Sequence, residues 1–298
     1  MSNIEKTSPL IRSAIFELLN CAPLPHTVDI LERTLEITDV LSDDFASLME
    51  DLLSSPFWQL ADYSGNPYKV MCLGLAKEID RLARQSKEPA YHSRQHFKDV
   101  CLVISYFISQ DRYSLFQQSS SNWWAISLEE KWLLLLAAIA HDLCHSGQVN
   151  RTPFEIEKNS LDVLGKYLSQ KNINPDLMNL VMSRVGPWIL GTDPAIYGQL
   201  LTRVSGEQVN HEDCLSMLLV ESDLFASALP IKGRVLGARL AKEWRRGYIA
   251  GANRIDSVEG RLAFLHHIRF ISPYAIAVGA EEIRLSSIKT LTDLKFRD

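Results

Sequence analysis

The sequence predicts an all-α fold. Apolar residues recur at helical spacing along most of the chain, helix-capping residues begin several of these segments, and no convincing alternation of apolar and polar residues marks a series of strands. With 298 residues, of which 46% are hydrophobic, the chain can bury a large core. One large domain with a smaller attachment, or two domains, would fit this length.

The N-terminal part of the chain carries the spacing of several helices. The segments with this spacing are 27–37, 42–53 and 68–83. Ser42 is a candidate cap of the second segment, and residues rich in serine, proline and glycine interrupt the pattern at 54–56 and 63–67. We expect residues 1–85 to form an N-terminal helical subdomain and 86–298 to form the main domain. Residues 1–85 could instead be the first part of one continuous bundle.

A helix that is apolar on all sides follows. Ser127-Leu-Glu-Glu130 is a capping box, in which the serine hydroxyl and the glutamate carboxylate each accept a hydrogen bond from an otherwise unpaired backbone N–H. The helix continues through 133–140 and ends near His141 and Asp142. Because it has no polar face, we expect it at the centre of the fold.

Helix-starting signals continue toward the C-terminus. Thr152-Pro153-Phe154-Glu155 has the pattern of a second capping box with proline at the first helical position, and Asn174-Pro175 begins another helix that ends near Gly191. Further helical patterns cover about 211–227, 231–247, 257–271 and 274–285. Several different helices therefore supply the polar residues discussed next.

Composition and charge argue against several classes of protein. The formal net charge of -5 shows no excess of Lys and Arg that could neutralise nucleic-acid phosphates, so we expect no nucleic-acid partner. The five cysteines include no C-x-x-C pair, which indicates neither a disulfide framework nor a zinc ribbon. The first ten residues lack a signal peptide's apolar segment, and the longest apolar run, 132–140, is far shorter than the roughly 20 residues that span a bilayer. We expect a cytoplasmic protein without a membrane partner.

Two pairs of histidines have metal-ligand spacing. His92 and His96 form one pair, His141 and His145 form the other, and Asp142 follows His141. On a helix, residues i and i+4 face the same way, so each pair could present two imidazoles to one cavity. Imidazole and carboxylate together suit zinc, iron or manganese, and additional water and carboxylate ligands admit magnesium. The alternative is that the spacing is accidental.

Two acidic residues interrupt a later apolar helix. Glu221 and Asp223 lie within Leu218-Leu-Val-Glu-Ser-Asp-Leu-Phe225. At least one of them is expected to point inward, where a cation would balance its charge. The alternative is that both carboxylates lie on the surface of an amphipathic helix, as most acidic residues do.

Four ordered segments carry a resemblance to a known family. They are Tyr91-His92-Ser-Arg-Gln-His96, Ala137-Ala-Ile-Ala-His141-Asp142-Leu-Cys-His145-Ser-Gly147-Gln-Val-Asn150, Ile189-Leu-Gly-Thr-Asp193, and Glu221-Ser-Asp223-Leu. This set resembles the HD-domain superfamily of metal-dependent phosphohydrolases. The closest likeness is to the catalytic domain of class I cyclic nucleotide phosphodiesterases, over about residues 88–280. The resemblance implies an HD-domain helical bundle over 86–298, with 1–85 as an N-terminal helical extension.

The resemblance also implies a metal site and a mechanism. His96, His141, Asp142 and Asp223 match the ligands of the first of two divalent ions, and Asp142 also bridges to the second ion, which is held mostly by water. His92 matches the general acid that protonates the leaving oxygen. A histidine can donate this proton near physiological pH, and two cations can activate the attacking water.

Other residues in these motifs match positions around the site. His145 matches a histidine near the bridging water and phosphate, and Glu157 matches a glutamate behind the metal ligands. Thr192 and Asp193 match a segment that supports the pocket, although they could equally serve as a helix terminus. Tyr91 and Asn150, within the quoted segments, complete the residues expected around the site.

The sequence departs from the phosphodiesterase pattern mainly where substrate specificity would be decided. Ser93 and Ser146 stand where the family usually has Asn and Pro, and no glutamine aligns with the one that holds the purine. The candidate substrate contacts in that late stretch are Arg261, Phe264, His266, His267, Arg269 and Phe270. The alternative is a helix that buries its apolar side and exposes these polar residues.

The sequence therefore predicts a phosphohydrolase of a small-molecule phosphoester, most plausibly a phosphodiester in a cyclic or small nucleotide. Two other readings stay open. One is an HD-type nucleotide phosphomonoesterase with the same metals, and the other is a catalytically idle metal- and nucleotide-binding sensory module. Retention of His92 favours an enzyme, because a module that only binds has no need of a proton donor. A homodimer is compatible with the sequence, which does not decide the oligomeric state.

Overall fold

The computed structural model confirms the all-α prediction. It describes residues 4–21, 27–42, 44–113, 122–207 and 209–295, and no strand occurs among them. The helices are α1 (Ile4–Asn20), α2 (Thr27–Leu41), α3 (Phe45–Leu53), α4 (Pro56–Ala61), α5 (Pro67–Gln85), α6 (Arg94–Ser109), α7 (Leu128–Ala140), α8 (Glu155–Gln170), α9 (Pro175–Leu190), α10 (Tyr197–Ser205), α11 (His211–Ala228), α12 (Lys232–Trp244), α13 (Ile249–Ile255), α14 (Val258–His267), α15 (Pro273–Ala277) and α16 (Ala280–Lys295). Two short 3-10 helices cover Gln110–Tyr113 and Pro194–Ile196.

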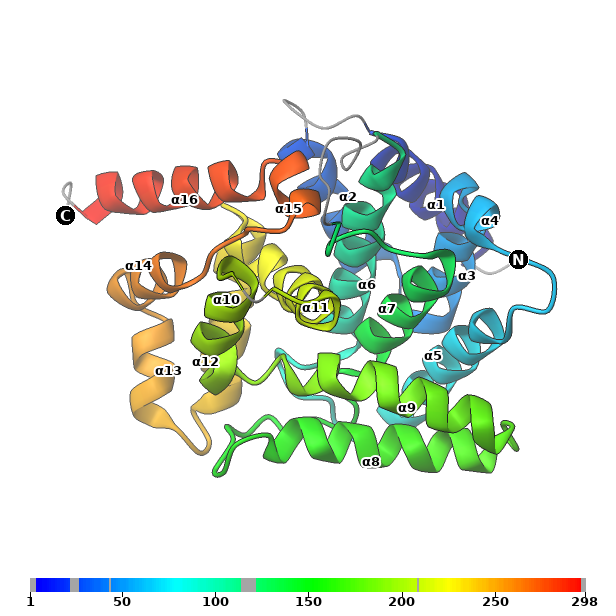
Figure 1. The fold of residues 1–298 in the computed structure, drawn as a ribbon. Helices are drawn as coiled ribbons and strands as arrows, with labels where there is room; N and C mark the ends of the chain where they lie inside the picture. Colours follow the sequence, from blue (N-terminus) through cyan, green and yellow to red (C-terminus); the bar gives the residue numbers. More distant parts are fainter. Residues whose placement is uncertain (1–3, 22–26, 43, 114–121, 208, 296–298) are drawn as a thin grey trace.

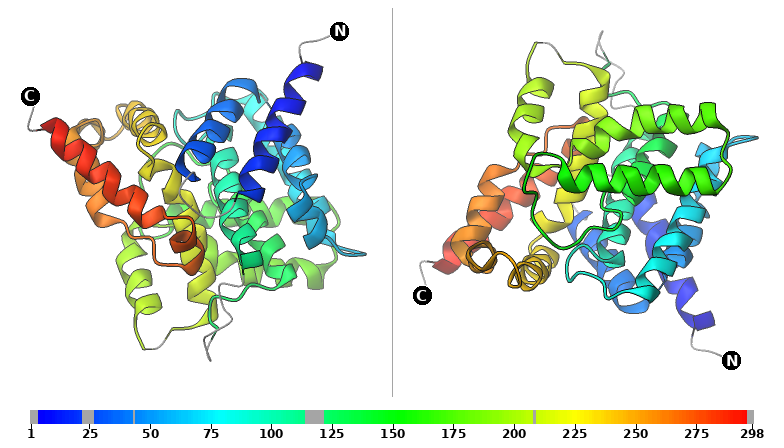
Figure 2. Two further views of the ribbon diagram at one scale, coloured as in Figure 1. Left: turned by 90° about the horizontal axis from the view of Figure 1, so that it is seen from above. Right: turned by 90° about the horizontal axis from the view of Figure 1, so that it is seen from below.

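The helices surround a central group made of α6, α7 and α11. In Figure 1, α8 and α9 run side by side below this group, whereas α12, α13, α14 and α16 lie to its left and the N-terminal helices to its right and behind it. Figure 2 shows the same arrangement from above and below, with α16 directed away from the N-terminal helices. The ends of the central helices therefore meet helices from both halves of the chain.

The capping box predicted at Ser127 is confirmed. The Ser127 hydroxyl accepts a hydrogen bond from the Glu130 N–H (3.2 Å), and the Glu130 carboxylate accepts one from the Ser127 N–H (2.8 Å). These bonds fix the start of α7, whose side chains from Glu130 to Ala140 are all buried. His141 and Asp142 follow directly at its end, so the expected central helix carries two of the predicted metal ligands into the core.

The second predicted capping box, at Thr152, is wrong. Helix α8 begins at Glu155 after Phe154, whose φ is 65°, and neither Thr152 nor the N-cap residue Phe154 caps the helix with its side chain. The Phe154 N–H instead donates to the distant Asp193 carboxylate (2.8 Å), and the Glu155 carboxylate accepts from the Arg151 N–H (2.9 Å). A contact with another part of the chain therefore sets this helix start.

The predicted C-terminal helices are correct in type but wrong in extent. Helix α14 ends at His267, so it does not reach 271. The pattern over 274–285 is divided between α15 and α16, because Gly279 adopts a φ of 73° that breaks the helix. The short helices α4 and α13 and the helices α1 and α10 were not predicted at all.

The main hydrophobic core extends through both predicted domains. Buried residues of the N-terminal helices, such as Leu18, Leu35 and Leu75, belong to the same apolar cluster as Leu135 of α7 and Leu219 of α11. Helix α1 packs against α6, and α5 packs against α7. Residues 1–85 thus share the core of the rest of the chain.

Two tryptophans join the N-terminal helices to the central group. The Trp58 and Trp132 rings lie 4.7 Å apart between centroids. The Trp132 indole donates to the Ala61 carbonyl (2.9 Å), and the Trp58 indole donates to the Ser105 hydroxyl (3.2 Å). Each buried indole N–H is therefore paired, as burial in an apolar core requires.

Polar contacts fasten α2 to α12. Glu32 accepts hydrogen bonds from two backbone N–H groups at the start of α12 (2.8 and 3.1 Å), which compensates the unpaired donors of a helix N-terminus. About two turns later on α2, Asp39 accepts from the Arg239 guanidinium (2.8 Å). Lys232, at the start of α12, lies 3.0 Å from the buried Asp99 carboxylate of α6. These contacts hold α12 at both α2 and α6.

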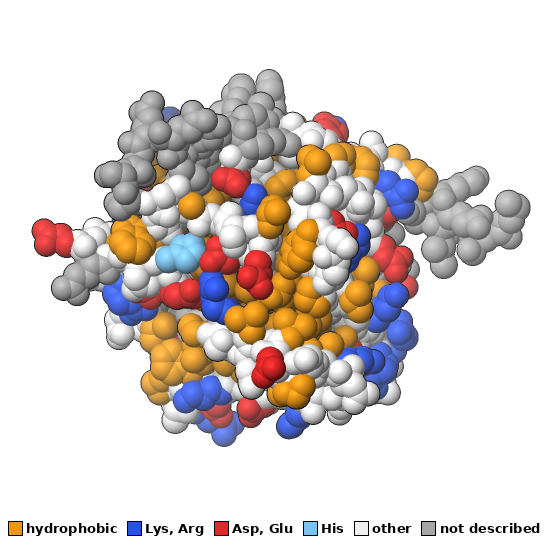
Figure 3. Space-filling view, turned by 45° about the vertical axis from the view of Figure 1, so that its right-hand side comes forward, with side chains coloured by type: hydrophobic (Ala, Val, Ile, Leu, Met, Phe, Trp, Pro, Cys, Tyr) orange, Lys and Arg blue, Asp and Glu red, His pale blue; other side chains and the backbone are white. Residues whose placement is uncertain are grey.

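The surface and the helix lengths complete the description. On the face shown in Figure 3, hydrophobic side chains gather over the central part, with charged side chains around them. No single helix in the described ranges is both long and apolar enough to span a membrane. The consecutive helices α11 and α12 would together be long and apolar enough, but the chain bends by 98° between them.

We expect the packing of α7 to contribute strongly to the free energy of unfolding. Leu135 of α7 is 0% exposed, so Leu135→Ala should lower the free energy of unfolding by about 2–5 kcal/mol, because it removes buried methyl groups and leaves a cavity. Leu60→Ala is the matched control, since Leu60 of α4 is 83% exposed and its truncation should change that free energy by less than about 0.5 kcal/mol. Urea unfolding measures both. Equal losses in the two variants would contradict the burial of α7.

Candidate metal-binding active site

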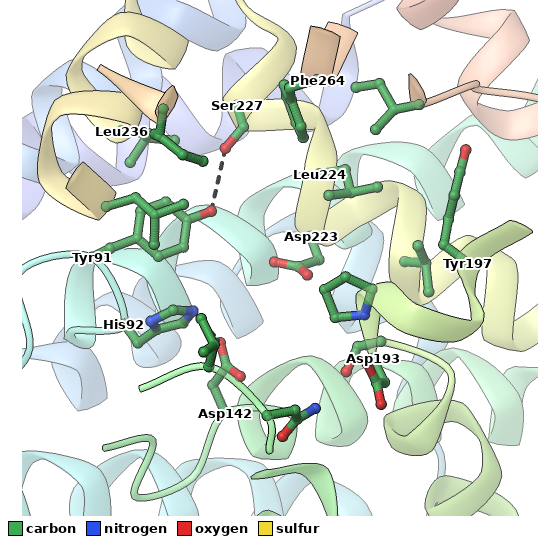
Figure 4. A pocket seen from close by; sticks show the side chains of 18 of the residues that line it. Tyr91, His92, Asp142, Asp193, Tyr197, Asp223, Leu224, Ser227, Leu236 and Phe264 are labelled. Atoms are coloured by element: carbon green, nitrogen blue, oxygen red, sulfur yellow. Dashed lines mark hydrogen bonds and ion pairs between the residues drawn. The ribbon is translucent and has the colours of Figure 1, made fainter. Parts of the chain in front are cut away.

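A cavity of about 500 Å³ opens where α11, α12 and α14 face the residues that follow α7. A volume of this order suits a drug-sized or nucleotide-sized ligand. Figure 4 shows Asp142, His92 and Asp223 on one side of the cavity, with Leu236 and Phe264 on the other. The wall is mainly apolar, and its polar groups gather at the end where α7 terminates.

Four predicted ligands converge at this polar end. His96 Nε2 lies 3.2 Å from Asp142 Oδ2, 3.1 Å from Asp223 Oδ1 and 3.2 Å from His141 Nε2. His141 Nε2 lies 3.2 Å from Asp142 Oδ2 and 3.7 Å from Asp223 Oδ1. Atoms that bind one ion at about 2.0–2.2 Å in neighbouring coordination positions are separated by similar distances. The donor set and its spacing therefore fit a divalent cation.

The His141 imidazole is oriented for ligation. Its Nδ1 lies 2.8 Å from the Ala138 carbonyl, which can only accept a hydrogen bond, so Nδ1 carries the proton. The unprotonated Nε2 of the neutral ring then points at the carboxylates. A backbone carbonyl that fixes the tautomer in this way is typical of a metal-bound histidine.

The charges at this end favour a cation. Burial alone would lower the pKa of His96, but hydrogen bonds to Asp142 and Asp223 outweigh burial and raise it to about 10. Burial also opposes protonation of His141, yet the adjacent Asp142 carboxylate raises its pKa. For Asp142 itself, the nearby histidines overcome burial and hold the pKa well below its usual range. The two carboxylates thus attract positive charge, which a metal ion could supply in place of protons.

His92 is held beside the ligands by a buried glutamate. The Glu243 carboxylate of α12 lies 2.6 Å from His92 Nδ1 and accepts hydrogen bonds from the backbone N–H groups of Tyr91 (2.7 Å) and His92 (3.1 Å). Burial alone would raise the pKa of Glu243, but its hydrogen bond to His92 outweighs burial, so the pKa is lowered. His92 Nε2, on the opposite side of the ring, lies 3.9 Å from Asp142 Oδ2. Nε2 is therefore the ring atom that faces the metal ligands.

His145 stacks on His92. The two ring centroids are 3.5 Å apart with an interplanar angle of 18°. His145 Nδ1 accepts a hydrogen bond from the Gly147 N–H (2.9 Å), so the proton of the neutral ring lies on Nε2. Burial, together with the nearby His92, lowers the pKa of His145 to about 4. His145 is therefore neutral at physiological pH.

Gly147 makes the turn that places His145 possible. Its φ is 75°, a conformation that residues with a side chain rarely adopt. A Cβ there would lie 3.0 Å from Glu243 Cγ. Both the turn and the close approach of Glu243 therefore require glycine at this position.

The structure separates the two acidic residues of α11. Asp223 faces the cavity and contacts the imidazoles of His96 and His141, as predicted for a ligand. Glu221 is fully buried elsewhere, and its carboxylate accepts hydrogen bonds from the backbone N–H groups of Ile271 (2.5 Å) and Ser272 (2.9 Å) before α15. Burial raises the pKa of Glu221 to about 7. Glu221 therefore has a structural role, and the reading that both carboxylates lie on the surface is wrong.

Of the residues expected around the site, Asn150 and Glu157 form a hydrogen-bonded pair, and Asp193 bonds two backbone N–H groups. The Asn150 amide donates to the buried Glu157 carboxylate (2.9 Å) and accepts from the Ile156 N–H (2.8 Å). Asp193 caps the 3-10 helix through the Ala195 N–H (2.9 Å) and also holds the start of α8 through the contact described above. These bonds fix the polar loop 143–154 against the cavity.

The other predicted residues take different positions. Tyr91 is oriented by a contact between its hydroxyl and the Ser227 hydroxyl at 3.2 Å, drawn in Figure 4. Thr192 lines the cavity while its hydroxyl donates to the Ile189 carbonyl (2.8 Å). His266 is exposed and does not line the cavity, whereas its neighbour His267 does. Of these two adjacent histidines of α14, His267 therefore lines the cavity and His266 does not.

The expected helical geometry of the histidine pairs is wrong. Only His96 lies within a helix, because α6 begins at Arg94, after His92. His141 is the C-cap residue that directly follows α7, and His145 lies beyond the turn that comes next. The imidazoles converge because helix ends and loops meet at one point, and not because residues i and i+4 share a helical face.

The sequence did not identify Glu243. It lies in Lys242-Glu-Trp-Arg245-Arg246, which has the pattern of a solvated charged face, yet its side chain is largely buried against His92. The available signal was its place at the end of an amphipathic helix, which does not distinguish it from exposed glutamates. Its role follows only from the tertiary packing of α12.

Comparison with known proteins agrees with the fold. The crystal structure of the phosphodiesterase domain of the RhoPDE fusion protein from the choanoflagellate Salpingoeca rosetta matches with a TM-score of 0.58 and 16% sequence identity, covering 84% of this chain and 100% of that chain. No protein-family model and no curated protein matches the sequence. At this identity the likeness shows that the chain has the fold of a phosphodiesterase domain.

The two acidic residues of α11 provide a matched test of the metal site. Asp223→Asn should lower Mn²⁺ affinity by about 10-fold or more, because it removes a charged ligand oxygen. Glu221→Gln should leave the affinity within about 2-fold, because Glu221 bonds backbone N–H groups away from the ligands. Isothermal titration of the metal-free proteins measures both, with circular dichroism as the control for folding. Loss of affinity in Glu221→Gln alone would contradict the assignment.

Proposed function

We propose that the chain is a metal-dependent phosphodiesterase that hydrolyses a phosphodiester of a cyclic or small nucleotide. The observation that carries this proposal is the convergence of His96, His141, Asp142 and Asp223 beside the pair formed by His92 and Glu243. One set has the chemistry of metal ligands, and the other that of an oriented proton donor. The phosphodiesterase-domain fold and the size of the cavity support the same assignment.

The four ligands would hold the first of two divalent ions, and Asp142, which faces the cavity, would also reach the second. When bound, such ions lower the pKa of a coordinated water toward neutrality and neutralise charge on the phosphoryl oxygens. Two imidazoles and two carboxylates are compatible with zinc, iron or manganese, and a site completed by water is compatible with magnesium. A water molecule is then the nucleophile, and no serine or cysteine nucleophile is required.

His92 would protonate the leaving oxygen. Nδ1 of His92 is hydrogen-bonded to Glu243, so the proton available to the substrate is the one on Nε2. This atom lies next to Asp142. The carboxylate also stabilises the imidazolium form that gives up this proton. Since two backbone N–H groups also hold the Glu243 carboxylate in place, the ring cannot turn away without losing its hydrogen bond to Glu243. The arrangement therefore orients the donor before substrate binds.

Neutral His145 would assist without competing for that proton. Its Nε2–H can donate a hydrogen bond to a phosphoryl oxygen or to the attacking water. Because its pKa is lowered to about 4, it places no second positive charge against His92 at physiological pH. The stacked pair thus offers one proton donor and one neutral hydrogen-bond donor.

The His92–Glu243 pair also favours an enzyme over a module that only binds. Neither residue belongs to the first metal's ligand set, yet Glu243 is buried to orient His92, and burying a carboxylate is costly unless it is paired. A binding module gains nothing from an oriented proton donor. The hypothesis of a catalytically idle sensory module is therefore less favoured.

The proposal is tested by elemental analysis of the purified protein and a turnover panel with Mn²⁺ or Mg²⁺. The panel contains cyclic nucleotides, linear dinucleotides, nucleoside monophosphates and bis(p-nitrophenyl) phosphate. Cleavage of diesters supports the proposal, whereas cleavage of monoesters alone would assign a phosphomonoesterase. Bound metal without any turnover would assign a binding module, and a protein that takes up no metal would overturn the proposal.

Substitutions separate the proton donor from the metal ligands. His92→Asn should lower kcat by roughly 100-fold or more, the contribution typical of general acid catalysis, with metal content near that of the wild type. Asp142→Asn should lose metal and activity together. Glu243→Gln should lower kcat less than His92→Asn, because it removes the charge that stabilises the imidazolium but keeps an acceptor for the two N–H groups.

The exposed Glu207→Gln serves as the control for the Glu243 variant, and its kcat should stay within about 2-fold of the wild type. Metal content is measured by elemental analysis and kcat by steady-state kinetics on the same preparations. A His92 variant that loses its metal would contradict the role assigned to His92.

A further inference from the structure

The cavity is lined by one cationic residue of α14. Among the described residues that line it, Arg261 of α14 is the sole lysine or arginine. Figure 4 shows Phe264, one turn later on the same helix, on the side of the cavity opposite Asp142 and His92. The cavity is therefore acidic and histidine-rich at one end and has the Phe264 ring on the opposite side, and Arg261 lines the cavity from the preceding turn of the same helix.

The Arg261 guanidinium has no ion-pair partner among the described residues, and Glu32 acts on it only at longer range. Its hydrogen bond within the described part of the chain runs from Nη2 to the Leu229 carbonyl (3.0 Å), and its buried Nε has no partner there. No carboxylate of the described ranges forms an ion pair with it, whereas the buried Lys232 and Arg284 pair with Asp99 and Glu281. A buried cation with unused donors is costly unless something else accepts from it.

The surrounding backbone holds the guanidinium in place. A Cβ at Gly233 would lie 2.4 Å from Arg261 Nη2, and one at Gly237 would lie 4.0 Å from Nη1. Gly233 thus leaves the space that the guanidinium occupies, whereas a side chain at Gly237 would only be in ordinary van der Waals contact with it. Burial and the nearby Arg234 lower the pKa of Arg261 to about 10, so it remains protonated at physiological pH. The Arg261 guanidinium is therefore charged and held in place, and not all of its N–H groups have a hydrogen-bond partner among the described residues.

A guanidinium can only donate, and its planar geometry matches two adjacent acceptor atoms. A 6-oxopurine such as guanine presents O6 and N7, which are both acceptors, whereas adenine presents N7 beside a donating amino group. A second phosphate group also offers paired acceptor oxygens. An aromatic ring like that of Phe264 can in turn stack on a base.

We propose that Arg261 determines substrate specificity by binding a pair of adjacent acceptor atoms, and that a guanine-type base provides them. This inference rests on the proposed function in one respect, namely that the phosphate of the same molecule lies at the metal end. It adds the class of nucleotide that the site prefers. Arg261 is accordingly a specificity residue and takes no part in proton transfer.

Binding of nucleoside monophosphates tests this without requiring turnover. We expect the Mn²⁺-loaded protein to bind GMP and IMP about 10-fold more tightly than AMP in isothermal titration, the discrimination typical of one bidentate contact. Arg261→Gln should reduce the GMP-to-AMP ratio to about 3 or less, because an amide can pair with either base edge. Arg245→Gln, at an exposed arginine of the same region, should leave the ratio unchanged.

Adenosine 3′,5′-bisphosphate distinguishes the two sources of acceptors. If it binds as tightly as GMP and loses that affinity in Arg261→Gln, the residue takes a phosphate, and the guanine assignment is overturned. Equal binding of GMP and AMP to the wild type, with no gain for the bisphosphate, overturns the proposal, as does a guanine preference that survives Arg261→Gln.

Turnover of bis(p-nitrophenyl) phosphate, which has no base, separates this inference from the proposed function. If the wild type does not hydrolyse it or any other diester, the proposed phosphodiesterase function fails regardless of Arg261. If it does, and the nucleotide preference is independent of Arg261, only the specificity inference fails.

Discussion

The arrangement of the site depends on the burial of α7. This helix has no polar face, so neighbouring helices must cover it on every side, and the two polar residues at its end can lie only where those helices leave an opening. His141 and Asp142 are therefore placed by the hydrophobic effect acting on the helix before them. The remaining polar groups reach the same point because α6 and α11 pack against α7.

The parts of the site that could be predicted are those encoded locally. An apolar helix followed by His-Asp indicates a buried polar site, and the motif order supplied His96 and Asp223. Local sequence did not decide between the carboxylates of α11, because Glu221 and Asp223 share the same apolar surroundings in the chain. Their roles differ through what packs opposite each one, which is a backbone turn for Glu221 and two imidazoles for Asp223.

The fold was predictable to a similar extent and for a similar reason. Helix type follows from periodicity, so the all-α class and most of the long helices were identified. The start of α8 depends on Asp193, almost forty positions later in the chain, and the burial of Glu243 depends on the packing of α12. Such long-range contacts leave no periodic signal, and therefore the helix boundary and the partner of His92 were both missed.

The attachment of α2 to α12 has a consequence for the unit that can function. Helix α12 is fastened near its start and its middle by Glu32 and Asp39, and near its end it carries Glu243. The N-terminal helices thus hold the helix that positions the proposed proton donor, and they also fill part of the common core. A fragment beginning at residue 86 would expose that core and leave α12 without its brace. The part of the chain that supports the proposed site therefore includes α2 as well as the helices that follow residue 85.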